Sequence, residues 1–238
     1  MSERSLAIET ATDICSVALA ETGRPVAVLS LYQPRRHSEQ LLLVVRSLLA
    51  RAEWQLADLG YIAVSAGPGS YTGLRIGLST AKGLCYASGA RLVGVSSLEA
   101  LGRRLFAAAR PGDLLVPAFD ARRGDIYAAI YRHDEHSMGV VEMPVASDAG
   151  AIAERLTSLP AGDLWLAGSG TDKLAAALPD ERLTRRTETT PDATAVALVA
   201  WQRWQRGETE DLAAFEPYYL RKFVAKRPER SPFEKLPF

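Results

Sequence analysis

A glycine-rich turn at residues 67–77 is the part of the sequence whose residue types point most directly to chemistry. The segment reads Gly67-Pro68-Gly69-Ser70-Tyr71-Thr72-Gly73-Leu74-Arg75-Ile76-Gly77. It follows the apolar run 61–66 and opens a helix-forming run that ends near Ser88, so the order is strand, turn and helix N-terminus. Such a turn lets the backbone approach a ligand closely, and the helix end favours anions. Leu74 stands where a P-loop carries lysine, so the sequence lacks a Walker-type grip on a triphosphate.

Two acids at expected strand ends, together with a second glycine turn, suggest a cleft between two halves of the chain. Glu9 ends the apolar run 6–9, and Asp120 ends the similar run 116–120. Each carboxylate could hold a divalent cation or polarise water, or it could accept hydrogen bonds from its own hairpin turn. The turn 168–170 could approach an adenine or a ribose, or be an ordinary strand-to-helix turn. The candidate residues of a nucleotide cleft are Glu9, Gly67, Gly69, Ser70, Asp120, Gly168 and Gly170.

The spacings needed for metal-dependent or nucleophilic catalysis do not occur. Leu41, and not a second histidine, follows His37 on the same face of its expected helix. His133 and His136 lie in a polar segment that we expect to be a solvated turn. There is no Gly-x-Ser-x-Gly elbow, and Ser70 fits a helix cap better than a nucleophile. We therefore predict no catalytic residue, no metal site and no cofactor.

The composition is that of an ordinary globular protein with no global attraction to nucleic acid or membranes. The 238 residues are 47% hydrophobic and 24% charged, with 28 basic and 28 acidic side chains. No apolar run approaches the roughly 20 residues that span a bilayer, and the first residues lack the apolar core of a signal peptide. Cys15 and Cys85 fit reduced, buried thiols. We expect a cytoplasmic protein.

The order of apolar runs predicts an α/β fold built from two duplicated half-domains with mixed sheets. In the first half we expect strands over 6–9, 15–19, 25–31, 61–66 and 91–95 and helices over 38–52, 72–88 and 97–109, with Ser38, Ser70 and Ser96 or Ser97 as caps. In the second half we expect strands over 116–120, 125–130 and 164–167 and helices over 171–178 and 191–206. The echo between the halves places the first domain at 1–110, the second at 111–220 and an irregular tail at 221–238.

Two helices of the first half carry more apolar and small side chains than one sheet needs. In helix 38–52 the stripe Leu41, Leu42, Val45, Leu48 and Leu49 suffices to cover a sheet, which leaves Leu43 and Val44 pointing away. Helix 72–88 places Gly73, Gly77, Ala81 and Cys85 at four-residue intervals, although a glycine inside a helix costs about 1 kcal/mol relative to alanine. Either these helices pack within the protomer, or they form an interface. The predicted interface residues are Leu43, Val44, Ser47, Gly73, Leu74, Gly77, Leu78 and Ala81.

Six segments, in order along nearly the whole chain, resemble the TsaB (YeaZ) family. These segments are residues 37–42, 67–77, 81–84, 93–101, 120–123 and 218–221. The resemblance implies an actin-like ATPase superfamily (ASKHA) fold and a requirement in threonylcarbamoyl modification (t6A) of the tRNA adenosine beside the anticodon. It further implies a non-catalytic protein that forms a heterodimer with the transferase TsaD through helices 38–52 and 72–88, with the ATPase TsaE joining the pair. Glu9 departs from the aspartate usual in that family, which weakens the case for metal–nucleotide chemistry there.

Other functions remain open at this stage. An ATPase or kinase of the same superfamily would use Glu9, Asp120 and the glycine turns. Without a partner, the exposed apolar helices favour a homodimer. Scattered basic residues favour a solvated surface, with tRNA contacted only indirectly or to a minor extent; these residues are Arg182, Arg185, Arg186, Arg221, Lys222, Lys226, Arg227 and Arg230.

Overall fold

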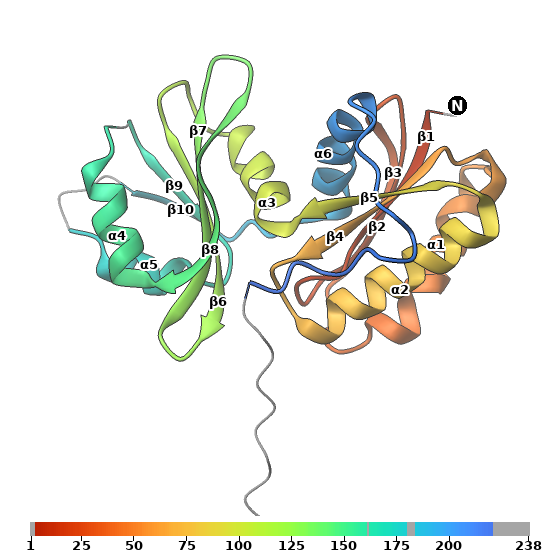
Figure 1. Cartoon of the computed structure of the whole chain (residues 1–238), viewed down its shortest axis with the longest axis horizontal. Coiled ribbons are helices and arrows are strands. Elements are labelled where there is room, and N and C mark those ends of the chain that lie inside the picture. The colour runs from red at the N-terminus through yellow and green to blue at the C-terminus, as the bar shows by residue number, and fades with distance from the viewer. Residues whose placement is uncertain (1–2, 161, 180–183, 221–238) are drawn as a thin grey trace, which may run out of the picture.

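The computed structural model describes residues 3–160, 162–179 and 184–220, and within them it forms two lobes, each built on a five-stranded sheet (Figure 1). The first sheet has the order β3-β2-β1-β4-β5, with strands Arg4–Glu9 (β1), Cys15–Glu21 (β2), Arg24–Leu31 (β3), Tyr61–Gly67 (β4) and Arg91–Ser96 (β5). The second has the order β10-β9-β6-β7-β8, with strands Leu114–Arg122 (β6), Asp125–His133 (β7), Met138–Asp148 (β8), Leu164–Ala167 (β9) and Thr184–Thr187 (β10).

The two sheets share one topology. In each, the first strand pairs antiparallel with the second strand and parallel with the fourth. Read in reverse, the order of the second sheet is β8-β7-β6-β9-β10, which matches β3-β2-β1-β4-β5 strand for strand. The prediction of a duplicated α/β unit with mixed sheets is therefore confirmed.

The helices cover both faces of the first sheet and both faces of the second (Figure 1). They are His37–Arg51 (α1), Tyr71–Ser88 (α2), Ser97–Phe106 (α3), Ala149–Ser158 (α4), Thr171–Ala177 (α5) and Ala193–Gln205 (α6), with a 3₁₀ turn at Leu56–Asp58. Helices α1 and α2 lie side by side on the outer face of the first sheet, and α6 covers its other face. Helix α3 lies between the sheets and packs on the inner face of the second, whose outer face carries α4 and α5.

Strand alternation explains the two unequal layers of the first lobe. Because neighbouring side chains point to opposite faces, Leu6 and Ile8 meet α1 and α2, whereas Ala7 meets α6. The face toward α6 is lined with alanines, which lets that helix approach closely. We expected the helix over 191–206 to belong to the second half-domain. The structure packs α6 on the first sheet instead, because its small and apolar side chains complete that alanine-rich layer.

The chain returns across the first lobe after α6. In this return segment, residues 207–220, Glu210 N–H donates to the Leu92 carbonyl oxygen at 2.8 Å and Tyr218 N–H donates to Ala66 at 2.7 Å. Phe215 enters the core against Gly94, where an added Cβ would lie 2.3 Å from the ring. The segment thereby partly covers the edge of β5, which is otherwise an open strand edge of the sheet.

Two of the three predicted helix N-caps are observed in the structure. The Ser70 and Ser96 hydroxyls accept hydrogen bonds from Gly73 N–H and Glu99 N–H, as expected of N-caps. Ser38 is not a cap, since α1 begins one residue earlier, at His37, after Arg36. The tail 221–238 and Arg182 lie outside the described residues. None of the helices in the described part of the chain has the length and apolarity to cross a membrane.

Candidate functional site

The glycine turn between β4 and α2 is packed against the turn that follows β1. Ser70 N–H donates to the Ala11 carbonyl oxygen at 2.7 Å. A Cβ on Gly69 would lie 2.4 Å from that same oxygen, and Gly67 has a φ of +105°, a conformation that glycine adopts readily. The glycines therefore allow two segments of the same chain to meet.

Glu9 is completely buried beside this turn. Its Oε1 accepts Ala11 N–H at 2.6 Å, and its Oε2 accepts the Ser65 hydroxyl. Burial raises the pKa of the Glu9 carboxyl to about 7, with the two hydrogen bonds opposing that rise. Of the two roles considered for this acid, the structure shows the hydrogen-bonded one: both oxygens are engaged by the chain itself.

Asp120 occupies the equivalent position near the end of β6 in the second lobe, two residues before the strand ends. Its Oδ1 accepts Lys173 Nζ and Arg122 N–H, each at 2.6 Å. Lys173, more than any other group, holds the pKa of Asp120 below its ordinary value. Nearby, added Cβ atoms on Gly168 and Gly170 would lie 2.3 and 3.0 Å from backbone atoms of β6.

The predicted cleft residues thus form two clusters, one in each lobe. Glu9 lies with Gly67, Gly69 and Ser70, and Asp120 lies with Gly168 and Gly170. Within the described ranges, the structure contains no group of three or more His, Cys, Asp or Glu side chains arranged to hold a metal ion. Each acid is bonded to its own turn, at the N–H two residues further on.

Two of the three histidines and both cysteines are buried, whereas His136 is exposed as expected. His37 lies buried against the Ile14 carbonyl oxygen at 3.2 Å. His133, expected in a solvated turn, is buried, and its ring stacks on Phe106 with centroids 4.0 Å apart. The prediction was wrong for His133 because β7 continues through that residue. Cys15 and Cys85 are free and buried.

Helix α1 exposes a different pair of apolar residues from the pair predicted. Leu43 is 58% exposed, as expected, but Val44 is only 4% exposed. Val44 stands three residues after Leu41 and four before Leu48, so it shares their buried stripe. Leu42, which we expected to cover the sheet, is 52% exposed instead.

Helix α2 turns its small side chains inward. Gly73, Leu74, Gly77, Leu78, Ala81 and Cys85 are all buried. A Cβ on Gly73 would lie 2.1 Å from the Thr10 carbonyl oxygen, and one on Gly77 would lie 2.2 Å from Thr10 Oγ1. The stripe predicted as an interface therefore packs on the protomer's own β1 and its following turn.

Another glycine of α2 has no such neighbour. Among the residues that the structure describes, an added Cβ on Gly83 meets nothing within 4 Å, and Gly83 is exposed. Sequence reasoning missed this residue, although its position two residues after Ala81 places it off the buried stripe. Tyr86, which is 87% exposed, was also missed.

We call the exposed outer sides of these two neighbouring helices the α1–α2 face. Its exposed residues include Leu42, Leu43, Arg46, Ser79, Gly83 and Tyr86. Ser47 is half-buried at its margin. Adjacent exposed leucines on a surface helix, with a large exposed tyrosine on the next helix, are typical of surfaces that bind other proteins.

Comparison with known proteins places these features in a family. The family model described as "TsaD: tRNA N6-adenosine threonylcarbamoyltransferase" matches residues 32–229. The "tRNA threonylcarbamoyladenosine biosynthesis protein TsaB" of Escherichia coli is 33% identical over 227 residues, which cover 93% of this chain and 96% of the relative. The protein of the same name from Bacillus subtilis is 36% identical over 159 residues, or 66% of each chain.

Solved structures agree on the fold. YeaZ from Pseudomonas aeruginosa superposes with a TM-score of 0.81 at 28% identity, covering 92% of this chain and all of that one. An inorganic polyphosphate/ATP-glucomannokinase from Arthrobacter sp. strain KM shares the two-lobed fold alone, with a TM-score of 0.50 at 11% identity over 85% of this chain. The predicted fold is confirmed by these likenesses, and the chain belongs to the TsaB (YeaZ) family.

Proposed function

We propose that this protein is a non-catalytic partner in the threonylcarbamoyl modification of tRNA. In this role it binds the transferase TsaD through the α1–α2 face and organises the complex, which the ATPase TsaE then joins. The names of the bacterial relatives support the pathway, since both are described as threonylcarbamoyladenosine biosynthesis proteins. The site of action would be the cytoplasm.

The observation that carries the proposal is the pairing of exposed leucines with an unexplained glycine. Leu42 and Leu43 each expose more than half of their surface to water. Gly83 destabilises α2 by about 1 kcal/mol relative to alanine. No described atom of the protomer lies close enough to explain why a side chain is absent there. A partner helix that approaches α2 closely would account for both features.

The acids of the two lobes support a non-catalytic role. Both oxygens of Glu9 are occupied by the chain's own donors, and Asp120 is paired with Lys173. A kinase or ATPase would need such carboxylates for a cation or for the attacking group. Turnover of ATP with magnesium by the isolated chain, measured by calorimetry and product release, would contradict this part of the proposal.

The test compares two surface variants with a matched control. Leu43→Asp puts a charge in the interface, and Gly83→Leu adds bulk where the protomer itself leaves space. Each should weaken binding to TsaD about 30-fold or more, the effect of losing a central contact of about 2 kcal/mol. Neither should lower the melting temperature much, because both sites are exposed.

The control is Val140→Asp on β8, a site with the same 58% exposure as Leu43 in the other lobe. It should bind TsaD normally and support normal tRNA modification in a strain that lacks the native protein. Normal binding by both α1–α2 variants would refute the interface. Without TsaD, we expect the native chain to form a homodimer through the same face, and sedimentation should show Leu43→Asp as a monomer.

A further inference from the structure

Two consecutive arginines stand in an unusual backbone conformation at the tip of the β6–β7 hairpin. Arg122 has a φ of +66° and Arg123 a φ of +52°, followed by Gly124 at +92°. The left-handed region is unfavourable for a residue with a Cβ, whereas glycine and asparagine enter it easily. Both arginine side chains are exposed, so burial does not explain their presence.

Two hydrogen bonds of the Asp120 carboxylate hold the backbone of this hairpin tip in place. Asp120 accepts the Arg122 N–H at 2.6 Å, and Lys173 fixes the Asp120 carboxylate at 2.6 Å. The clamp uses only the backbone of Arg122, so it would work equally well with another side chain there. Strain that persists at an exposed site points to a requirement for the side chains themselves, here two guanidinium groups.

The first lobe presents a second basic feature at the start of α2. Arg75 donates from Nη1 to the Tyr71 hydroxyl at 2.7 Å, and its guanidinium carbon lies 5.4 Å from the centre of the Tyr71 ring. The ring of Tyr219 lies 5.3 Å from that of Tyr71, tilted by 32°. Arg75 is exposed, and the rings of Tyr71 and Tyr219 are 37% and 41% exposed, so the start of α2 presents two partly exposed aromatic rings beside one cation.

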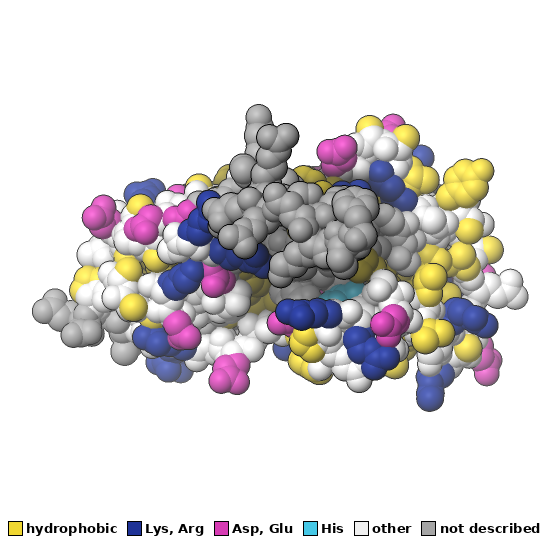
Figure 2. Space-filling model, turned by 90° about the horizontal axis from the view of Figure 1, so that it is seen from below, with side chains coloured by type: hydrophobic (Ala, Val, Ile, Leu, Met, Phe, Trp, Pro, Cys, Tyr) yellow, Lys and Arg dark blue, Asp and Glu magenta, His cyan; other side chains and the backbone are white. Residues whose placement is uncertain are grey.

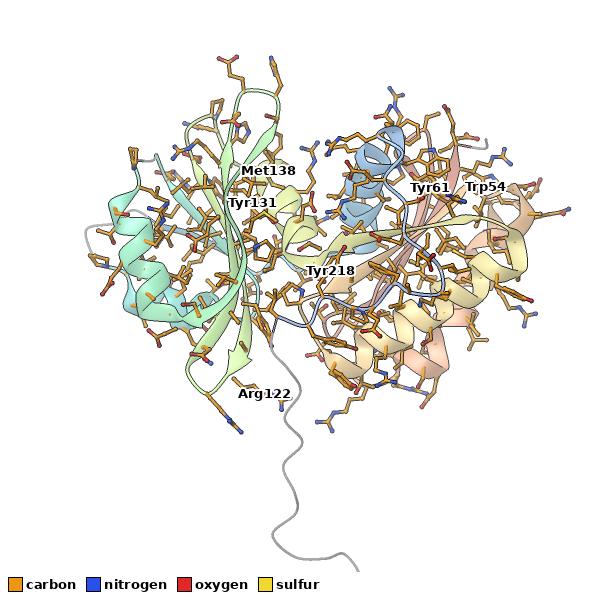
Figure 3. The ribbon with its side chains drawn as sticks, in the orientation of Figure 1. Trp54, Tyr61, Arg122, Tyr131, Met138 and Tyr218 are labelled. Atoms are coloured by element: carbon orange, nitrogen blue, oxygen red, sulfur yellow. The ribbon has the colours of Figure 1, made fainter. Side chains whose placement is uncertain are left out.

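Both features lie at the same end of the molecule. Figure 3 shows Arg122 at the lower end of the second lobe, next to the region between the lobes, and Figure 1 shows α2 beginning at the lower end of the first lobe. Seen from that side, Lys and Arg side chains occur on both lobes, interspersed with Asp and Glu side chains (Figure 2).

We infer that this end of the molecule binds the ribose–phosphate backbone of tRNA directly. Arg122 and Arg123 contact phosphates, for which the planar guanidinium is well suited. Tyr71, Arg75 and Tyr219 stack against an unpaired base, as aromatic and arginine side chains do in RNA recognition. The inference rests on the proposed function, because it takes the RNA of that reaction as the ligand. Tyr71 and Arg75 are exposed residues at the start of α2, so the RNA-binding end adjoins the α1–α2 face.

The test measures binding of fluorescently labelled tRNA by the full chain, alone and in complex with TsaD, at several salt concentrations. The variant Arg122→Asn/Arg123→Asn removes both guanidinium groups while keeping a residue that tolerates positive φ. Its tRNA affinity should fall, and the slope of log affinity against log salt should decrease by about two, one for each lost phosphate contact. Its melting temperature should be unchanged or higher.

Two control variants separate charge from position. Arg122→Lys/Arg123→Lys keeps both charges and should recover most of the salt slope. Arg24→Ala/Arg110→Ala removes two exposed arginines from the opposite ends of the strands, one in each lobe, and should bind tRNA like the native chain. Tyr71→Ala/Tyr219→Ala should weaken binding without changing the slope, because stacking releases no counterions.

Unchanged tRNA affinity and slope in the asparagine variant, or no detectable tRNA binding by the native chain in either form, would overturn the inference. Loss of TsaD binding in that variant, with tRNA binding intact, would assign the arginines to a protein interface instead and would also overturn it. Failure of the proposed function would be a different result. Leu43→Asp would then bind TsaD as tightly as the native chain does, whichever tRNA affinities the arginine variants have.

Discussion

Helix α2 contains glycines with opposite surroundings. Gly73 and Gly77 are pressed against Thr10 of the same chain, where an added Cβ would lie 2.1 and 2.2 Å from the nearest atom. Gly83, less than two turns further along, faces open space. A glycine inside a helix indicates that something approaches closely, but the residue does not say whether that neighbour belongs to the same chain or to another. The buried glycines therefore allow close packing within the lobe, whereas the surface at Gly83 leaves space for a partner.

The largest effect is expected from Gly73→Ala. Its Cβ would meet the backbone oxygen of Thr10, which cannot move without shifting the end of β1. We expect a loss of about 3 kcal/mol or more in the free energy of unfolding, at the upper end for overpacking. Urea unfolding measures it, with Gly83→Ala as the matched control on the same helix. Equal stabilities of the two variants would contradict the contrast between the glycines.

Gly77→Ala tests the same kind of close contact, here with a side-chain atom, Thr10 Oγ1. Removing that hydroxyl in Thr10→Ala/Gly77→Ala should cost less than the sum of the single changes, because each relieves the other. Gly77→Leu, which adds still more bulk at this contact, is therefore expected to disturb folding. A double-mutant cycle by urea unfolding measures the coupling, and strict additivity would argue against the contact.

A comparable effect concerns Glu9, on the buried side of the same lobe. Burial raises its pKa from 4.5 to about 7, so the folded state binds this proton more tightly than the unfolded state does. The stabilisation is complete below pH 4.5 and is lost as the pH rises to about 7, for a total on the order of 3 kcal/mol. Unfolding free energies at pH 5 and pH 8 measure it. In Glu9→Gln this part of the pH dependence should disappear, and its persistence would show that another group is responsible.

The smallest effect is expected from Gly83→Ala. Since the added methyl group meets nothing in the described part of the protomer, it should raise the free energy of unfolding by about 0.5–1 kcal/mol through helix propensity. If a partner helix approaches there, the same methyl group should slightly weaken binding to TsaD while stabilising the free chain. A variant that is less stable than the native protein would mean that Gly83 has a role inside the protomer.

The fold was largely predictable because its signals are local. Strand alternation, the Ser70 and Ser96 caps and the acid at the end of β1 and near the end of β6 are read from neighbouring residues. Strand β8 was missed because most of its residues are only partly buried. Helix α4 was also missed, although its buried residues Ala149, Ile152, Ala153 and Leu156 follow the spacing of an amphipathic helix. Helix α6 was recognised as a helix but assigned to the second half, because no local signal says which sheet a helix covers.

The candidate interface was predictable in its location but not in its residues. Helical periodicity alone offered Val44 and the glycine stripe, and only the packing on β1 and Thr10 showed that these point inward. Leu43 was placed correctly on the exposed side, and Leu42 was not.

By itself, the sequence determined the repeated strand and helix order and the helices that carry surplus apolar surface, because these depend on periodicities of two and 3.6 residues. The tertiary structure decided which face of each helix is buried, the proximity of Thr10 to α2, and the meeting of two basic features at one end of the molecule. Those relations join residues far apart in the chain, and only the folded arrangement of the two sheets brings them together.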